Sequence, residues 1–362
     1  MYEMNGEPKA QYSDFCSVLF CMRIIILVIT VDTSIKMVSW RENMENLSIY
    51  SSPKDASSPV DPIVPLVKQQ LQVILASEGS LQEVLDYLRE SNGKMVRPIL
   101  VSHSHRICGE ADETTIIQLA TGVELIHMAS LVHDDIIDQS NLRRGQPTIQ
   151  ARYGPAVAVL AGDFLFAAAF SLFTRWNQAG VLSLMTDVIR NMCAGEVDQL
   201  VAPKQDEGFY WNYIHKKTAC LLGAACKVGA MVSSLPTVEN MDKMEQFGLN
   251  LGYAFQLVDD ILDFTGDSKI LGKMQGSDFQ QGIWTLPIIR GVNRMVIPSD
   301  WRVSLSQPEL NQLLTDSGVL DEVYQEACTY SLQAIELLSD YQDGLIKDKL
   351  TQIARFVVDR NH

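Results

Sequence analysis

Most of the chain shows a helical pattern of apolar residues. From residue 65 onward, apolar side chains recur at spacings of three and four, as at Leu81, Val84, Leu85 and Leu88. This spacing places them on one face of an amphipathic helix. The same pattern continues, between turns that contain glycine and proline, through residues 116–137, 156–173, 182–200, 213–233, 244–264 and 320–338. No segment shows the two-residue alternation of a strand. The pattern therefore predicts one all-α domain over residues 61–362.

The first 60 residues follow a different pattern. Residues 15–31 are strongly apolar but interrupted by Arg23, and residues 46–62 are rich in Ser, Pro and Asp. The apolar stretch is shorter than the about 20 residues that a membrane-spanning helix needs. It also lacks the basic start and the cleavage site of a signal peptide. We interpret residues 1–60 as an N-terminal extension and linker, either poorly ordered or a start-site artefact with translation beginning near Met37 or Met44.

The composition narrows the function classes. The formal net charge is −15 over 362 residues, which disfavours nucleic-acid binding as the main function. The seven cysteines are an odd number and include no C-x-x-C pair, so a disulfide framework is not expected. These features fit a reducing compartment, and we expect a cytoplasmic protein.

Two copies of a D-D-x-x-D motif interrupt the apolar pattern. They consist of Asp134, Asp135 and Asp138, and of Asp259, Asp260 and Asp263. On a helix, the first and last aspartates of each copy lie one turn apart on the same face. Carboxylates this close raise one another's pKa unless a cation neutralises them, and Mg²⁺ prefers such hard oxygen ligands beside substrate phosphates. A single copy could equally be a solvated helix face. Two copies with apolar flanks favour a metal–diphosphate site.

Basic residues near these motifs could supply the positive charge that diphosphates require. The candidates are Lys94, Arg97, Arg143, Arg144, Lys217 with Thr218, and Lys273. Arg143 and Arg144 follow the first motif closely, and arginine suits phosphates because its planar fork donates paired hydrogen bonds. Lys94 and Arg97 lie in a turn before a predicted helix, a favourable place to bind an anion. Singly, each could be a surface cation; together they fit two separate diphosphate groups.

In this order and spacing, the motifs resemble those of the trans-isoprenyl diphosphate synthase family, in particular its long-chain polyprenyl branch of heptaprenyl, octaprenyl or solanesyl type. The matching segments are Gly-Lys-Met-Val-Arg-Pro (93–98), Glu-Leu-Ile-His (124–127), Leu-Val-His-Asp-Asp-Ile-Ile-Asp (131–138), Arg-Arg-Gly-Gln-Pro-Thr (143–148), Ala-Gly-Asp-Phe-Leu (161–165), Gly-Glu (195–196), Lys-Thr (217–218), Phe-Gln-Leu-Val-Asp-Asp-Ile-Leu-Asp (255–263) and the segment 272–287. The resemblance covers the chain from about residue 60. It implies an isoprenoid-synthase-type helical bundle around a deep central cavity. It also implies a prenyltransferase that condenses isopentenyl diphosphate head-to-tail with an allylic diphosphate such as farnesyl diphosphate.

The resemblance further implies a role for each candidate residue. Isopentenyl diphosphate would be held by Lys94, Arg97, His127 and Arg144. The allylic diphosphate would be held by Arg143, Lys217, Thr218, Gln256 and Lys273. About two or three Mg²⁺ ions per site would be ligated by Asp134, Asp138, Asp259 and Asp263, and the catalytic set would also include Asp135, Asp260 and Lys217. The sequence departs from the family pattern at Asn92, Met95, Gln150 and Met274. These positions neighbour binding residues, so the departures bear on affinity and not on the reaction class.

Product length should depend on the helix that carries the first motif. Ala129 and Ser130, one turn before Asp134, are small, whereas short-chain members of the family often carry aromatic residues there. Small residues would leave a tunnel open for a long product. The alternative is that they only allow close helix packing.

Two other functions are compatible with parts of the pattern. A class I terpene cyclase also ionises a diphosphate, but typically carries a single D-D-x-x-D copy. A non-catalytic subunit usually lacks one of the two copies. The resemblance implies a homodimer and leaves open a small regulatory subunit. A long product suggests a role in quinone side chains and leaves open membrane association through the product.

Overall fold

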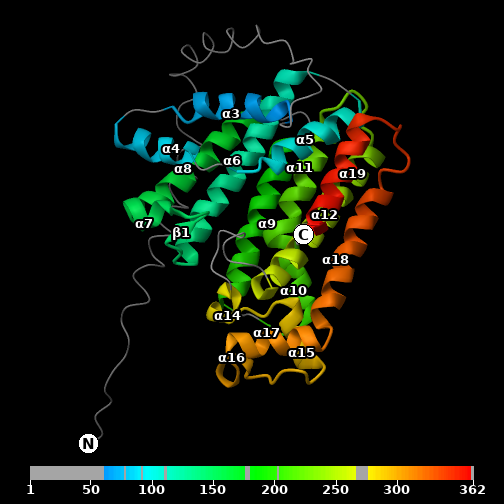
Figure 1. Ribbon diagram of the computed structural model, residues 1–362. Coiled ribbons are helices and arrows are strands. Elements are labelled where there is room, and N and C mark those ends of the chain that lie inside the picture. The colour runs from blue at the N-terminus through cyan, green and yellow to red at the C-terminus, as the bar shows by residue number, and fades with distance from the viewer. Residues whose placement is uncertain are drawn as a thin grey trace, which may run out of the picture. The chain divides into compact units, whose positions relative to one another are not determined.

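The computed structural model describes residues 61–76, 79–90, 93–109, 112–175, 180–201, 204–265 and 276–359. Regular structure within these residues is almost entirely helical (Figure 1), so the predicted all-α class is confirmed. A short ribbon of β1 (Leu142–Arg143) and β2 (Gln146–Pro147) pairs antiparallel, with Leu142 opposite Pro147. The predicted extension over residues 1–60 lies outside the described residues, which all belong to the unit Pro59–His362.

Short connections join most of the helices. In chain order they are α3 (Ile63–Ile74), α4 (Ser80–Glu90), α5 (Val96–Ile107), α6 (Glu113–Ile137), α7 (Ile149–Tyr153), α8 (Pro155–Phe173), α9 (Val181–Val201), α10 (Glu207–Ile214), the π-helix η3 (His215–Ala219), α11 (Cys220–Met231), α12 (Val238–Thr265), α14 (Ser277–Gln281), α15 (Leu286–Asn293), α16 (Trp301–Ser304), α17 (Gln307–Asp316), α18 (Val319–Glu336) and α19 (Leu345–Val358).

The first aspartate motif lies at the C-terminal end of α6. The helix begins after Asp112, whose side chain accepts a hydrogen bond from the Thr115 backbone N–H at 2.9 Å, a favourable N-cap. It ends at Ile137, and the N–H of Asp138 still donates to the carbonyl of Asp134 at 2.8 Å. The next residue, Gln139, has φ of 51° and cannot continue the helix. The motif is therefore presented at a helix end beside a turn.

Glycines let α12 approach its neighbours closely. A Cβ atom at Gly248 would clash with the backbone of Leu222 in α11, and one at Gly252 would clash with Ala219 in η3. Such contacts bring the backbones of packed helices together. They fix the distance between the helix that carries the second motif and the π-helix that carries Lys217.

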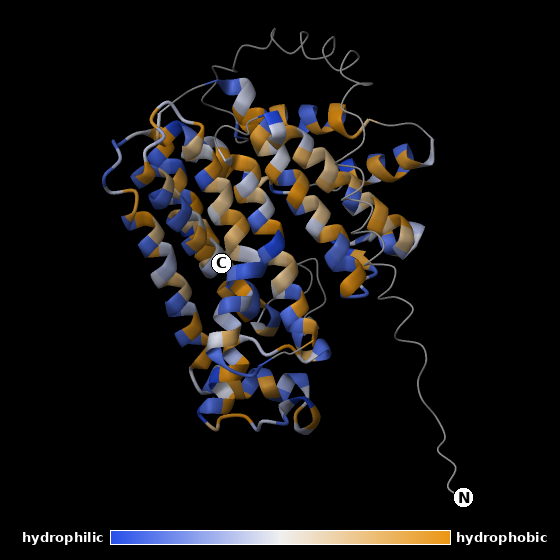
Figure 2. Cartoon of the chain, turned by 180° about the vertical axis from the view of Figure 1, so that it is seen from behind, coloured by the Kyte–Doolittle hydropathy of each residue, from blue (hydrophilic) through white to orange (hydrophobic). Residues whose placement is uncertain are grey.

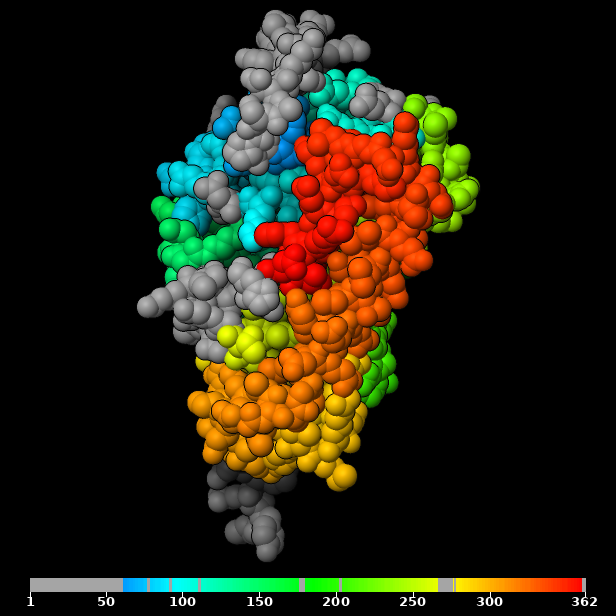
Figure 3. Space-filling model, turned by 45° about the vertical axis from the view of Figure 1, so that its right-hand side comes forward, coloured from blue at the N-terminus to red at the C-terminus, as the bar shows by residue number. Residues whose placement is uncertain are grey.

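A second, smaller hydrophobic core lies beyond the C-terminal end of α12. It includes Phe264 from that helix, Trp301 from α16 and Leu310 and Leu314 from α17, all nearly or fully buried. The helices α15, α16 and α17 gather at one end of the unit, near α14 (Figure 1 and Figure 3). Phe279 of α14 also packs against this core.

Within the described residues, two helices, α6 and α8, are long and apolar enough to cross a membrane by length and composition alone. In α6 the apolar window is 72% buried, as expected of a central core helix. In α8 only 39% of the window is buried, so this helix leaves an apolar surface uncovered. Figure 2 shows apolar and polar residues alternating along the helices throughout the unit.

Candidate active site

The three carboxylates of the first motif have different surroundings. Asp138 is exposed, Asp134 is half-buried and Asp135 is only 5% exposed. Burial raises the pKa of Asp134 to about 6; Lys217 partly offsets this effect, and the carboxylates of Glu196 and Asp138 add to it. A cation beside Asp134 would relieve this repulsion. The surroundings therefore suit a metal ion.

Arg143 binds the buried Asp135. Its Nε donates to Oδ1 at 2.9 Å and to Oδ2 at 3.1 Å, and its Nη2 lies 2.8 Å from Oδ1. The β1–β2 ribbon reverses the chain through Arg144 and Gly145, which have φ of 53° and 76°. This reversal brings Arg143 back to α6, the helix that carries Asp135. The structure thus brings Arg143 to the first motif, and its binding of the allylic diphosphate stays a prediction.

Gln150, one of the departures from the family pattern, ties down the end of α6. Its Nε2 donates to the backbone oxygens of Asp135 at 2.6 Å and Ser140 at 2.8 Å. The Thr148 hydroxyl also donates to the Ser140 oxygen, at 2.7 Å. A helix end leaves carbonyl groups without helical partners, and Gln150 satisfies two oxygens there. Gln150 therefore has a structural role at this position, and its hydrogen bonds to the end of α6 do not involve the aspartate side chains of the motif.

The second motif contains a buried aspartate that is held by side chains. Asp260 is 4% exposed; the Tyr210 hydroxyl donates to its Oδ2 at 2.6 Å, and Gln256 Nε2 donates to its Oδ1 at 2.9 Å. Burial raises the pKa of Asp260 to about 7, while these hydrogen bonds oppose the rise and Asp259 adds to it. Both oxygens of Asp260 are engaged by protein donors.

The outer residues of the second motif are more accessible. Asp259 and Asp263 are both half-buried. The Oδ2 of Asp263 accepts a hydrogen bond from the Asp278 backbone N–H at 3.1 Å, and its carbonyl accepts one from Gly276 at 3.2 Å. These bonds place the backbone of Gly276 and Asp278 beside Asp263.

Lys217 lies on η3, which packs against α12 and α9. Its Nζ is 2.6 Å from Glu196 Oε1 and 5.4 Å from the ring centroid of Tyr213. Burial alone would lower the pKa of Lys217, but Tyr213, Glu196 and Asp134 raise it above its usual range. Lys217 therefore stays protonated. Single-turn π-helices often occur at functional sites, and this one turns Lys217 toward the first motif.

A second cationic cluster surrounds Glu124, which is 4% exposed. Burial lowers the pKa of Arg97 and raises that of Glu124, and the opposite charges of the two groups counteract both shifts. Burial, together with the charges of Arg97 and Arg144, holds the pKa of His127 well below its usual value, so His127 is neutral. A Cβ atom at Gly93 would lie 3.5 Å from both Arg144 Nη1 and Glu124 Oε1. The structure thus brings Arg97, His127 and Arg144 together.

Lys94 lies at the edge of this second cluster. It is exposed, and its Nζ lies 5.5 Å from the ring centroid of Phe356 in α19. The neighbouring Met95 is buried and has φ of 52° at the start of α5. Lys273, predicted to bind the allylic diphosphate, lies outside the described residues, as do Asn92 and Met274.

The two residues predicted to set product length lie inside α6. Ala129 has no exposed surface. Ser130 is half-buried, and its hydroxyl donates to the backbone oxygen of His127 at 2.9 Å. Their effect on product length stays a prediction.

Four residues of the site received no role from the sequence: Glu124, Glu196, Tyr210 and Asp278. Glu124 and Glu196 belong to matching segments, so the pattern could have marked them. Tyr210 and Asp278 are 50 and 15 residues away from the aspartates they contact. No local spacing signals such contacts.

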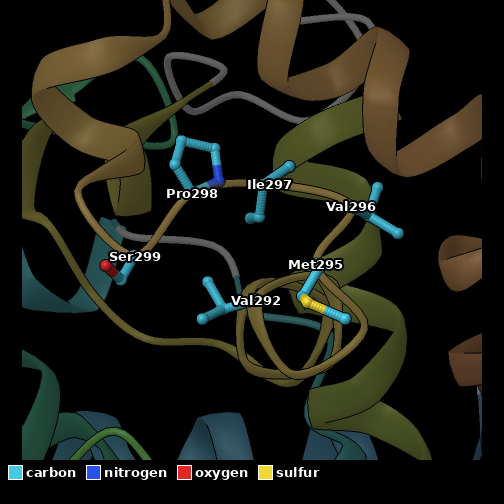
Figure 4. Close-up of a pocket in the computed structure, with 6 residues that line it drawn as sticks. All are labelled: Val292, Met295, Val296, Ile297, Pro298 and Ser299. Carbon is cyan, nitrogen blue, oxygen red and sulfur yellow. The ribbon is translucent and has the colours of Figure 1, made fainter.

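A shallow pocket elsewhere is formed by the end of α15 and the loop after it (Figure 4). Its lining consists of Val292, Met295, Val296, Ile297, Pro298 and Ser299. It contains no charged side chain, so it offers no group to balance a diphosphate.

The helical bundle with paired aspartate motifs and separate cationic clusters defines a prenyltransferase. Residues 78–300 match the model of the family described as polyprenyl synthetase. An octaprenyl diphosphate synthase from Haemophilus influenzae is 32% identical over 317 residues, which are 83% of this chain and 95% of the relative. Heptaprenyl diphosphate synthase component 2 from Bacillus subtilis is 30% identical over 81% of this chain and 87% of its own length.

Solved structures agree with these relatives. A polyprenyl synthase from Caulobacter crescentus, complexed with calcium and isoprenyl diphosphate, has a TM-score of 0.76 at 32% identity and covers 86% of this chain and 100% of its own. Heptaprenyl diphosphate synthase from Staphylococcus aureus has a TM-score of 0.76 at 31% identity, with coverage of 85% and 100%. The chain belongs to the polyprenyl synthetase family, and the predicted fold and enzyme class are confirmed.

Proposed function

We propose that the chain catalyses the Mg²⁺-dependent, head-to-tail condensation of isopentenyl diphosphate with an allylic diphosphate such as farnesyl diphosphate, giving a long all-trans polyprenyl diphosphate. The observation that carries the proposal is the presence of two separate cationic clusters. Lys217 and Arg143 adjoin the first aspartate motif, whereas Arg97 and Arg144 adjoin Glu124. A cyclase needs a site for one diphosphate only, so two clusters favour elongation.

The available side chains suit Mg²⁺. The first and last aspartates of each motif offer hard oxygen ligands. These residues are Asp134, Asp138, Asp259 and Asp263. Among the described residues, no three metal-ligating side chains converge on one point. Mg²⁺ is usually held by one or two carboxylates, with water and substrate phosphates supplying its other ligands. When bound, about two or three such ions would neutralise charge on the leaving diphosphate.

The residues of the chain account for the other parts of the reaction. Lys217 and Arg143 hold the allylic diphosphate and stabilise the charge that develops as the bond from C1 to oxygen breaks. Lys94, Arg97 and Arg144 hold isopentenyl diphosphate so that its double bond attacks C1. A carbon–carbon bond forms, and a proton is lost to the departing diphosphate. Apolar walls keep water from the cation.

The proposal is tested by incubating the purified chain with farnesyl diphosphate, isopentenyl diphosphate and Mg²⁺ and measuring product length. We expect long polyprenyl diphosphates, none without isopentenyl diphosphate, and no turnover after chelation of the metal. Conversion of farnesyl diphosphate alone to a cyclic product would overturn the proposal in favour of a cyclase.

The same proposal includes the fate of the product and the location of the chain. The product would supply a quinone side chain, and the protein would be cytoplasmic, with membrane contact through its product.

An apolar surface on α8 and α9 supports a homodimer. Leu160 of α8 is 60% exposed, and Val197, Leu200 and Val201 of α9 are between 54% and 69% exposed; the two helices pack against each other. Exposed apolar residues on neighbouring helices are typical of interaction surfaces. Sedimentation equilibrium should give a dimer, and Leu160→Glu should weaken it. A wild-type monomer would contradict this proposal.

A small regulatory subunit is the second candidate partner. Two relatives, from Bacillus subtilis and Geobacillus stearothermophilus, are named heptaprenyl diphosphate synthase component 2. The activity of the purified chain alone separates the two possibilities. Full turnover without an added protein excludes a required subunit, whereas an inactive but folded dimer favours one.

A further inference from the structure

The hydroxyl of Tyr87 connects α4 to the β1–β2 ribbon. It donates to the backbone oxygen of Pro147 in β2 at 2.6 Å, although the two residues are 60 positions apart. The ring of Tyr87 is held by two residues of α7: its centroid lies 4.3 Å from Arg152 Cζ, and it meets the ring of Tyr153 edge-on at a centroid distance of 6.2 Å. The two helices and the ribbon lie at the same side of the unit (Figure 1). Cation–π and edge-to-face contacts restrict the orientation of a ring, so α7 holds the Tyr87 hydroxyl against Pro147.

The ribbon needs such attachments to keep one position. Each of its strands has two residues, and a two-stranded ribbon by itself is at best marginally stable in water. The bonds from Arg143 to Asp135 fix β1 to α6. The bond from Tyr87 fixes β2 to α4. Arg144 lies at the turn between the two strands, with φ of 53°, so its position depends on both attachments.

The same hydrogen bond joins the two chain segments that meet in the second cationic cluster. Tyr87 precedes Gly93 by six residues, and Pro147 follows Arg144 by three. Gly93 and Arg144 are neighbours, because a Cβ atom at Gly93 would lie 3.5 Å from Arg144 Nη1. Burial and the charge of Arg144 both lower the pKa of Arg97, since like charges repel. The two segments therefore approach each other against this repulsion, and the bond from Tyr87 opposes their separation.

We propose that Tyr87 is a positioning residue of the isopentenyl diphosphate site, which holds Arg144 beside Arg97 through the β1–β2 ribbon. This inference rests on the proposed function. A ribbon that is already fixed spares the binding step the free energy of ordering Arg144. The attachment therefore acts on the binding of isopentenyl diphosphate. Arg143 keeps its own bonds to Asp135, so binding of the allylic diphosphate should depend much less on Tyr87.

Tyr87→Phe tests the hydroxyl, because it keeps the ring and its contacts with α7. The KM for isopentenyl diphosphate should rise about 3–10-fold, the range expected for one hydrogen bond. The kcat and the KM for the allylic diphosphate should change by no more than about twofold. Steady-state kinetics with each diphosphate varied in turn measures all three. Tyr87→Leu, which also removes the ring contact with Arg152, should raise the KM for isopentenyl diphosphate further. An unchanged KM in both variants, or an equal rise in the KM of both substrates, would overturn the inference.

A matched control separates loss of any tyrosine hydroxyl from loss of this attachment. The Tyr341 hydroxyl donates to Asn240 Oδ1 at 3.1 Å and lies 3.8 Å from Cys108 Sγ. Cys108 follows Arg97 by 11 residues at the other end of α5, about 16 Å along the helix. Tyr341→Phe should lower thermal stability by an amount similar to Tyr87→Phe and leave both KM values unchanged. An equal rise in the KM for isopentenyl diphosphate in both variants would reduce the effect of Tyr87 to one on folding.

A double-mutant cycle tests whether Tyr87 acts through Arg144. In the Arg144→Ala background, Tyr87→Phe should have little further effect on the KM for isopentenyl diphosphate, because the side chain that it positions is gone. If the two substitutions instead raise this KM independently, so that their fold-changes multiply, Tyr87 acts through another part of the chain and the inference is overturned. Absence of polyprenyl product from the wild-type chain would contradict the proposed function instead.

Discussion

Arg143 reaches back eight residues to bind both carboxylate oxygens of Asp135. Asp260 holds the same place in the second motif and is likewise buried and engaged on both oxygens, by Tyr210 and Gln256. The second aspartate of each motif is therefore buried, and its hydrogen bonds fix the position of a neighbouring side chain. The first and last aspartates remain the residues suited to metal ions. The two D-D-x-x-D copies therefore share their spacing and also the difference between a buried second aspartate and more accessible first and last aspartates.

Asp135→Asn should act mainly on the allylic substrate. Loss of the charge-assisted bonds releases Arg143, which then binds the diphosphate less well. We expect the KM for the allylic diphosphate to rise about 10–100-fold, with a much smaller change in the Mg²⁺ concentration needed for half-maximal activity. Steady-state kinetics with each component varied in turn measures both quantities.

The control for Asp135→Asn is Asp187→Asn. Asp187 forms an exposed ion pair with Arg190 at 3.0 Å, and exposed pairs contribute little. This variant should leave both the KM and the Mg²⁺ dependence unchanged. If Asp135→Asn alters the Mg²⁺ dependence as strongly as Asp134→Asn does, then Asp135 is itself a metal ligand.

Ala129→Phe should shorten the product by at least one isoprene unit. Ala129 has no exposed surface and lies one turn before the first motif, so a phenylalanine there would fill space along α6 that the growing chain needs. Ser130→Ala keeps the residue small and should leave product length unchanged. Chromatographic analysis of the dephosphorylated products distinguishes the two. An unchanged distribution in Ala129→Phe would remove Ala129 from the tunnel.

Asp61 should make stability depend on pH in the acid range. Burial alone would raise its pKa, but His103 Nε2 at 3.0 Å and Lys349 Nζ at 2.9 Å hold the pKa well below its usual range. A carboxyl whose pKa is lower in the folded state contributes stability above its unfolded pKa of about 3.9, and this stability is lost as the pH falls below that value.

Asp61→Asn tests this contribution. At neutral pH the variant should unfold with a free energy lower by about 1.5–3 kcal/mol, the strength of hydrogen bonds to charged groups. The difference from the wild type should shrink as the pH falls from about 5 to about 3. Urea denaturation at several pH values measures it. A difference that is constant over this range would assign the loss to packing.

Much of the fold and part of the site could be predicted from local sequence. Apolar spacing predicted the helices around both motifs, although α6 is buried on nearly all sides over residues 118–126. The separate role of Asp135 could not be predicted, because it depends on how the β1–β2 ribbon turns Arg143. Nor could that of Asp260, whose partner Tyr210 is 50 residues away. The π-helix that carries Lys217 packs against Gly252 of α12, and the apolar pattern does not predict it.

Gly252→Ala should lower thermal stability and kcat together. The added methyl group would clash with Ala219 in η3, and overpacking of this kind costs about 1–3 kcal/mol. Because η3 also carries Lys217 and Thr218, any shift that relieves the clash displaces the allylic site, so kcat should fall together with the thermal midpoint. Gly344→Ala is the control, since its Cβ would meet no atom within 4 Å and both quantities should be preserved. A Gly252→Ala enzyme that is destabilised but keeps wild-type kcat would show that the close approach of α12 supports the fold without positioning Lys217.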